Sequence, residues 1–219
     1  MDIIMTQSPS AAHAANTSDT RPIEDHPFAP VLSPDADIMM MGTFPPTEDK
    51  WAMPFHYPNF YNDMWRIYGA VFFDDPDHFR IGQEKRFDHQ QIRDFFFERR
   101  IASCPTVKQA IRETGNASDK NLTVVTPVNL TEVLNQVPQV KTLFTTGGKA
   151  TEVLYSLLDP IPPKSKQPKT NQMVSYPYPH TEGYELKLYR LPSTSRAYPL
   201  ALDKKVAAYR TFFEKMGKL

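Results

Sequence analysis

Apolar runs that alternate with amphipathic segments constrain the fold of this chain more than any other feature. The run "DIMMM" (37–41) is short and continuous, which is typical of a strand buried on both faces of a sheet. Strands that alternate with helices predict an α/β layer fold with a largely parallel central sheet. The sequence predicts further strands at 121–127, 140–146 and 184–191, and helices at 62–72, 88–103, 105–115, 129–137, 147–159 and 203–216.

The size and composition of the chain narrow its class. A chain of 219 residues suits one domain with a substantial core. Residues 1–20 are rich in Ala, Ser and Thr, so we expect a disordered tail there and a single domain over 21–219. Lys plus Arg total 25 and Asp plus Glu also total 25. This balance gives no overall attraction to polyanions, but it does not exclude a local basic patch.

The cysteine count and the hydropathy exclude several further classes. Cys104 is the single cysteine, which excludes a disulfide framework and an all-cysteine metal or iron–sulfur site within this chain. We expect it to be a packed thiol. No apolar run approaches the roughly 18 residues that span a bilayer. Residues 1–20 contain no Lys or Arg and no long apolar core, so they make a poor secretory signal, and we expect a cytoplasmic monomer without a membrane partner.

Two unusual loops follow predicted strands. The segment "GTFPPTEDKWAMPFHYPNFYNDMW" (42–65) leaves the strand at 37–41 and is far longer than a turn requires. The segment "LPSTSRAYP" (191–199) follows the strand at 184–191, and its hydroxyl and N–H groups suit phosphate oxygens, with an ST-turn as an equally good interpretation. Ligands of parallel sheets bind at the carboxyl ends of strands, so the two loops could form one site.

Other motifs favour less specific interpretations. The segment "TTGGKAT" (145–151) lacks the spacing of a phosphate-binding loop and indicates a tight strand-to-helix turn. Glu48 and Asp49 could form a paired-carboxylate site, but solvated surface charge is favoured. The six histidines show no spacing typical of a metal site. Lysines in "PPKSKQPKTNQ" could touch phosphates if the protein holds nucleic acid: Lys164, Lys166 and Lys169.

Taken together, the two loops resemble the two signature motifs of the uracil-DNA glycosylase superfamily. The pattern is most similar to the branch of mismatch-specific and hypoxanthine-DNA glycosylases, and it runs from about Ile23 to the C-terminus. Phe44 stands where the mismatch-specific enzymes have an asparagine, and Leu191 stands where the classical uracil enzymes have a histidine. The matching segments are "GTFPP" (42–46), Tyr57, "NDMW" (62–65) and "LPSTS" (191–195), with "GNASDKN" (115–121) and "TTGGKA" (145–150) between them.

The resemblance implies a fold and an activity. We expect a three-layer α/β sandwich with a central, largely parallel sheet of four or five strands flanked by helices. The implied activity is that of a monofunctional DNA glycosylase in base excision repair, which flips out a deaminated base, uracil or hypoxanthine, and removes it by hydrolysis. The implied partner is DNA that contains a damaged base. No cofactor and no metal are expected.

The resemblance also implies roles for single residues. Asn62 would be the catalytic residue that positions water or holds the base, with Asp63 in reserve and a helix cap as the plain alternative for Asn62. Tyr57, or less favourably Phe55, would stack on the extruded base. The other base-binding residues would be Gly42, Thr43 and Phe44, and the DNA-binding residues would be Ser193, Thr194, Ser195, Arg196 and Tyr198, of which Arg196 or Tyr198 would fill the vacated stack.

Two rival functions stay open on the sequence. Because Phe44 and Leu191 replace polar groups of active relatives, the chain could bind nucleic acid or a nucleobase without cleaving it. An unrelated small-molecule hydrolase would need Glu48 or Asp49 to face a pocket.

Overall fold

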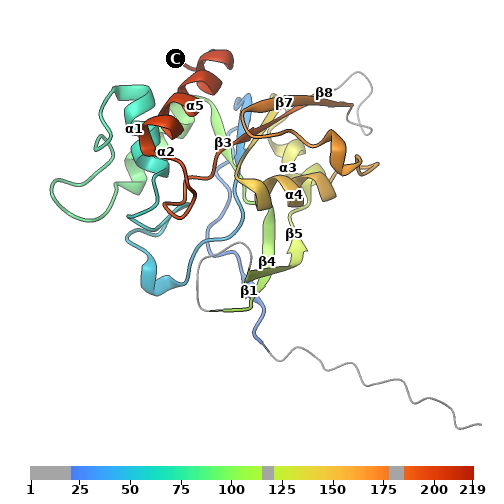
Figure 1. Ribbon diagram of the computed structural model, residues 1–219, viewed down its shortest axis with the longest axis horizontal. Coiled ribbons are helices and arrows are strands. Elements are labelled where there is room, and N and C mark those ends of the chain that lie inside the picture. The colour runs from blue at the N-terminus through green and yellow to red at the C-terminus, as the bar shows by residue number, and fades with distance from the viewer. Residues whose placement is uncertain (1–20, 115–120, 178–184) are drawn as a thin grey trace, which may run out of the picture.

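A mixed sheet of five strands forms the centre of the molecule. A computed structural model gives the structure of residues 21–114, 121–177 and 185–219. The strand order is β3-β2-β6-β8-β7, and only β7 runs antiparallel to its neighbour (Figure 1). The largely parallel sheet predicted from the sequence is therefore confirmed. The strands are β2 (Ile38–Met41), β3 (Ile101–Ser103), β6 (Thr142–Thr146), β7 (Gln172–Pro177) and β8 (Glu185–Leu191).

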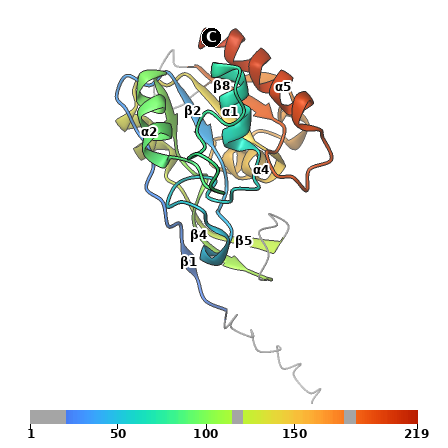
Figure 2. The same cartoon turned by 90° about the vertical axis from the view of Figure 1, so that its left-hand side faces the viewer.

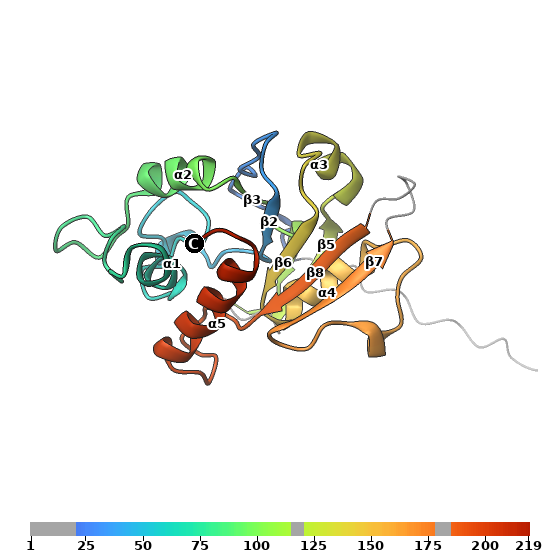
Figure 3. The same cartoon turned by 90° about the horizontal axis from the view of Figure 1, so that it is seen from above.

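Helices cover both faces of this sheet and complete a three-layer sandwich (Figure 3). The first face packs against α1 (Met64–Phe73), α2 (His89–Glu98) and α5 (Leu202–Lys215). The second face packs against α3 (Leu130–Gln136) and α4 (Gly148–Ser156). Successive residues along each strand point alternately to the first and the second core, as strand geometry requires. Met40, Phe144 and Tyr189 are paired in register on the first face, and Met39, Leu143 and Leu188 on the second.

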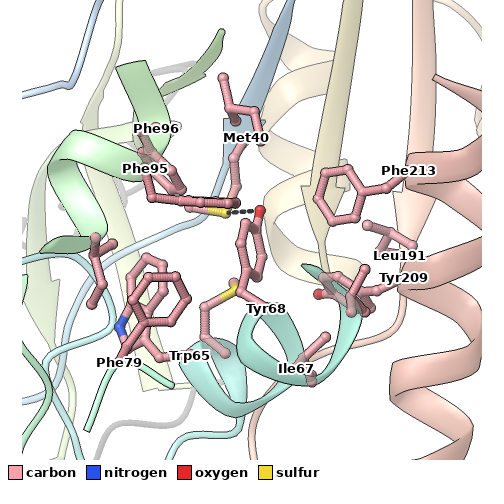
Figure 4. Close-up of a cluster of buried hydrophobic side chains, with 14 of the residues drawn as sticks. Met40, Trp65, Ile67, Tyr68, Phe79, Phe95, Phe96, Leu191, Tyr209 and Phe213 are labelled. Carbon is pink, nitrogen blue, oxygen red and sulfur yellow. Dashed lines mark hydrogen bonds between the residues drawn. The ribbon is translucent and has the colours of Figure 1, made fainter. Parts of the chain in front are cut away.

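The core on the first face is rich in aromatic side chains (Figure 4). Tyr68 of α1 is fully buried there, and its hydroxyl donates to Met40 Sδ at 3.4 Å. Burial raises the pKa of Tyr68 well above its ordinary value, so this phenol stays neutral. Trp65 packs beside Tyr68 with ring centroids 5.7 Å apart. This core fixes α1, and with it the segment that enters α1, against the sheet.

A second, antiparallel sheet lies at one end of the molecule (Figure 2). It consists of β1 (Glu24–Asp25), β4 (Val107–Arg112) and β5 (Leu122–Pro127) in the order β1-β4-β5. The predicted helix at 105–115 is wrong, because this segment forms β4. Register shifts around Gln109 place Val107 and Ala110 on one buried side, so a bulged strand imitates the three-residue spacing of a helix.

Two further expectations about secondary structure need correction. The helix expected over 88–103 ends at Glu98, and Ile101–Ser103 forms β3 because it pairs with β2. Strand β7 was not predicted, because its sequence has no clear apolar alternation. Short 3₁₀ turns lie at η1 (Glu48–Lys50) and η3 (Lys164–Lys166).

Several other expectations concern single residues or termini. Cys104 is buried, and burial raises the pKa of its thiol to about 12, which confirms a packed thiol. The expected tail at 1–20 and most of "GNASDKN" lie outside the described residues. Within the ranges that the structure describes, no helix combines the length and the apolar character needed to cross a membrane.

Candidate functional site

The two loops predicted to share a sheet edge line one pocket of about 300 Å³. The first loop leaves β2 at Gly42, and the second leaves β8 at Leu191. Both strands end at the same edge because they run parallel within one sheet. The lining residues are His26, Phe28, 42–46, 56–59, Tyr61, Asn62, Ser103, Pro105, Thr146 and 193–197.

Tyr57 forms a fixed wall of the pocket. Its hydroxyl bonds to Thr146 Oγ1 at 2.5 Å, and its backbone has a φ of 52°, which is uncommon outside glycine. The Trp65 indole N–H holds this backbone, since it lies 3.2 Å from the carbonyl oxygen of His56 and 3.3 Å from that of Tyr57. A Cβ on Gly42 would lie 2.5 Å from the Tyr57 hydroxyl. Glycine at position 42 therefore makes room for the tyrosine ring.

Strand β4 braces the start of the first loop. The Gly42 carbonyl accepts from both the backbone N–H and the hydroxyl of Thr106, each at 2.9 Å. The Arg112 guanidinium donates to the Pro45 carbonyl at 2.7 Å and lies 5.3 Å from the centre of the Phe44 ring. The small sheet, which the sequence did not reveal, thus positions residues 42–46.

Two histidines on one side of the pocket were not found from the sequence. The ring centres of His26 and Phe44 lie 5.2 Å apart, and His56 Nε2 lies 3.0 Å from the Ala29 carbonyl oxygen. Desolvation by burial lowers the pKa of both histidines to about 4, so both are neutral at pH 7. The concentration of His, Phe and Pro at 26–30 is the only signal that could have indicated this wall.

Asn62 lines the pocket and also bonds to the start of a helix. Its Oδ1 accepts the backbone N–H of Met64, the first residue of α1, at 2.9 Å. The N-cap residue is Asp63, so the expectation that Asn62 itself is the N-cap is wrong by one residue. Because the backbone N–H of Met64 can only donate, the Asn62 atom that faces it must be the oxygen Oδ1 and not the nitrogen Nδ2. The Nδ2 group remains as a donor, while Oδ1 is committed to the helix.

Asp63 joins the two loops behind the pocket and is not among the lining residues. Its carboxylate contacts Lys205 Nζ at 2.9 Å and Arg196 Nε at 3.3 Å. Lys205 is 1% exposed and also donates to the Ser195 carbonyl at 2.8 Å. The backbone N–H of Asp63 donates to the Thr194 carbonyl at 3.0 Å. Lys205, on the exposed-looking run "DKKVAA", gave no signal in the sequence, because its partner lies 142 positions away.

The second loop forms two consecutive hydroxyl turns. Ser193 Oγ accepts the N–H of Ser195, and Ser195 Oγ accepts the N–H of Ala197, both at 3.2 Å. The ST-turn interpretation is therefore confirmed, and each accepting hydroxyl keeps its own O–H to donate. Thr194 is buried, the Arg196 side chain is 51% exposed, and Tyr198 is not among the residues that line the pocket.

Comparisons with known proteins bear on the fold. No protein-family model matches this chain, and no curated protein matches it. A solution NMR structure from Methanosarcina acetivorans, described as a "putative Uracil DNA glycosylase", is similar to it with a TM-score of 0.55 and 19% sequence identity. The likeness covers 86% of this chain and 98% of that one. The two proteins share a fold.

The structure places other candidate residues away from the pocket. Glu48 and Asp49 are exposed on η1 and do not line the pocket. The hypothesis of a small-molecule hydrolase that uses these carboxylates is therefore wrong. Phe55 is buried against Trp65 and Phe96, and it cannot stack on a ligand in the pocket. Two other candidates also lie elsewhere, since Leu191 is in the first core and the lysines of 164–169 are exposed. The segment "TTGGKAT" forms the predicted strand-to-helix turn, and of its residues Thr146 lines the pocket.

Metal ligation has no geometric support among the residues with described positions. Within 21–114, 121–177 and 185–219, no three His, Cys, Asp or Glu side chains are grouped to hold a metal ion. The pocket lining from the same residues contains no carboxylate. The chemistry available to the pocket therefore comes from amides, hydroxyls, neutral imidazoles, backbone groups and the guanidinium of Arg196.

Proposed function

We propose that this protein is a DNA glycosylase that extrudes a deaminated base, uracil or hypoxanthine, and removes it by hydrolysis. One observation carries the proposal: loops from opposite ends of the chain form a single pocket with an aromatic wall, an amide and a rim of hydroxyls. The fold shared with the protein from Methanosarcina acetivorans also supports it. The proposed partner is DNA that carries such a base.

Base recognition would take place between the rings of the first loop. A pocket of about 300 Å³ lies at the small end of the range for ligand sites, which suits one extruded base. Tyr57 would stack on the base, and Phe44 would close the opposite side. Backbone N–H groups near Thr43 and Phe44, which line the pocket, would read base oxygens. The neutral imidazole of His26 would add a hydrogen-bonding group without charge.

Cleavage would proceed through a sugar with oxocarbenium character. The bond between C1′ and the base nitrogen breaks, and its electron pair leaves with the base. The oxygen of a water molecule then bonds to C1′, and one proton of that water is ultimately carried by the free base. The products are an abasic site and the base. In the absence of a lining carboxylate among the described residues, hydrogen-bond donors that stabilise the departing base would supply the catalysis.

Asn62 is the proposed catalytic residue for this step. Its Oδ1 already accepts the Met64 N–H, so its Nδ2 is the atom best suited to act on the ligand. We therefore favour a role in holding the base over a role in accepting a proton from water. An amide donor placed before the reaction stabilises developing negative charge without reorganisation.

The second loop would hold the DNA backbone. Ser193 and Ser195 each have a hydroxyl that can donate to a phosphate oxygen, and the backbone of Thr194 lies between them. Arg196 is exposed beside them, but its guanidinium is tied to Asp63 at 3.3 Å, so it would neutralise a flanking phosphate and not enter the space left by the extruded base. Tyr198 would contact the strand farther from the pocket.

A non-catalytic nucleobase-binding protein is the second candidate. Two observations favour it: Asn62 Oδ1 already accepts the backbone N–H of Met64, and no carboxylate of the described residues lines the pocket. Such a protein would extrude and bind the base but leave the glycosidic bond intact.

Incubation with damaged oligonucleotides tests the two candidates. Single- and double-stranded oligonucleotides that carry uracil, hypoxanthine or xanthine are incubated with the protein, and abasic sites are then cleaved and counted. We expect product from at least one lesion with the wild type, and greatly reduced product with Asn62→Ala. Asn135→Ala, an exposed asparagine on α3, is the matched control.

The variant Asn62→Asp separates the two roles of the side chain. It keeps an oxygen to accept the backbone N–H of Met64, but it replaces the Nδ2 donor with an acceptor. If Asn62 holds the base, Asn62→Asp will be as inactive as Asn62→Ala while its thermal unfolding matches the wild type. Full activity of Asn62→Asp contradicts that role. Binding of lesion DNA without any cleavage by the wild type would favour the second candidate.

A further inference from the structure

Tyr61 is an exposed aromatic residue on the lip of the pocket. It is 50% exposed, although it lines the pocket beside Asn62. The other lining rings, such as Tyr57 and Phe44, are half-buried or buried. An aromatic ring that is half exposed next to a ligand pocket offers a stacking surface, because a planar group that packs on it buries apolar area.

The ring of Tyr61 is held in place by its neighbours. Its backbone N–H donates to Asn59 Oδ1 at 2.7 Å. The edge of the ring packs on Phe60 at 5.6 Å between centroids, and the buried Phe60 stacks on Phe87 at 5.2 Å. A side chain fixed in this way loses little conformational freedom when a ligand covers it.

Two cations from different parts of the chain flank the Tyr61 ring. The Arg196 guanidinium lies 5.3 Å from the ring centroid, and the Lys85 ammonium lies 5.8 Å from it. Arg196 belongs to the second loop, and Lys85 to the connection between α1 and α2. An aromatic ring between cations is the arrangement that proteins use to hold a nucleic-acid strand.

We propose that Tyr61 stacks on the nucleobase next to the extruded nucleotide on the same strand, while Lys85 and Arg196 neutralise the flanking phosphates. This inference rests on the proposed function, since it assumes a nucleic-acid strand in the pocket. The role differs from that of Arg196, whose guanidinium is tied to Asp63 at 3.3 Å and so cannot turn freely into the stack. Stacking on Tyr61 is tolerant of sequence, because every base offers a planar face.

A binding experiment that needs no cleavage tests this inference. The probe is a single-stranded oligonucleotide with a tetrahydrofuran abasic site and a fluorescent 2-aminopurine beside it, titrated with the protein. Fluorescence anisotropy gives the affinity, and quenching of the 2-aminopurine reports stacking. The variants are Tyr61→Ala and Tyr61→Phe. Phe97→Ala is the matched control, because Phe97 is 41% exposed on α2 with the Arg93 guanidinium 6.0 Å from its ring.

The expected results follow from stacking alone. Tyr61→Ala should bind the probe about tenfold more weakly and lose the quenching, whereas Tyr61→Phe should keep both within about twofold. Phe97→Ala should resemble the wild type. Unchanged affinity and quenching in Tyr61→Ala would overturn the inference.

The outcomes also separate this inference from the proposed function. Wild-type cleavage of lesion DNA together with undiminished binding by Tyr61→Ala would refute the stacking role and leave the glycosylase function standing. Binding that depends on Tyr61 without any cleavage would support the stacking role and refute the glycosylase function. A wild type that binds no oligonucleotide would refute both.

Discussion

The first and second loops of the pocket are held in very different ways. The first loop is braced from several sides: Thr106 and Arg112 hold its start, and Trp65 and Thr146 hold Tyr57. The second loop is short, and its serines bond mainly to their own backbone. Its firmest tie to the rest of the molecule is the buried Lys205, which contacts the Ser195 carbonyl and Asp63.

This difference matches the tasks proposed for the loops. Selection among similar bases requires groups fixed before the ligand arrives, and many independent contacts provide that rigidity. Contact with a phosphate backbone tolerates more freedom, because charge and hydroxyl donors act over a wider range of positions. The first loop should therefore withstand the loss of single contacts, whereas the second should depend mainly on the contacts of Lys205 and Asp63.

Removal of Lys205 should produce the largest effect. Lys205→Met leaves the buried Asp63 carboxylate without this partner, and loss of one member of a buried pair costs about 3–5 kcal/mol of unfolding free energy. Urea unfolding measures the loss, with Lys204→Met on the exposed side of α5 as control. The double variant with Asp63→Asn should recover part of the stability. A loss below about 1 kcal/mol would mean that the second loop has other supports.

A side chain at Gly42 should have the next largest effect. Gly42→Ala places a Cβ 2.5 Å from the Tyr57 hydroxyl, which its bond to Thr146 keeps from moving away. Overpacking of this kind costs up to about 3 kcal/mol in thermal or urea unfolding. Combination with Tyr57→Phe should relieve part of the cost, because the next nearest ring atom is 3.2 Å away. Equal losses with and without the Tyr57 hydroxyl would contradict this explanation.

A fall in pH should destabilise the protein through the first loop, by less than the two substitutions above. The folded chain lowers the pKa of His56 from 6.5 to about 4, so the unfolded chain binds the proton more tightly. The stability contributed by neutral His56 is complete above pH 6.5 and is lost as the pH falls toward 4. Between pH 7 and 5, His56 alone should lower the free energy of unfolding by about 2 kcal/mol. Urea unfolding at a series of pH values measures this change.

Substitution of single histidines tests the source of this pH dependence. His56→Gln should reduce the slope of the stability curve between pH 7 and 5 by about half, because the pKa of His26 is lowered equally. His89→Gln at an exposed position is the control. An unaltered slope in His56→Gln would assign the effect to other groups, His26 first among them, since burial lowers its pKa equally.

The sequence by itself determined the layer architecture and the place of the pocket. Short apolar runs such as 37–41 are typical of buried strands, and their alternation with helices brings the carboxyl ends of β2 and β8 to one edge. The composition of 42–65 and 191–199 was then enough to predict that both loops meet there, because local pattern and strand direction decide this.

Only the tertiary structure decided what supports the pocket. The bulged strand β4 has the apolar spacing of a helix, and it becomes a strand because β1 and β5 pair with it. Lys205 finds Asp63 across 142 positions, and the wall that contains His26 comes from a segment without a periodic pattern. Such contacts depend on which distant residues the folded chain brings together. They produce no local sequence pattern, because each residue is stabilised by a partner far away in the sequence.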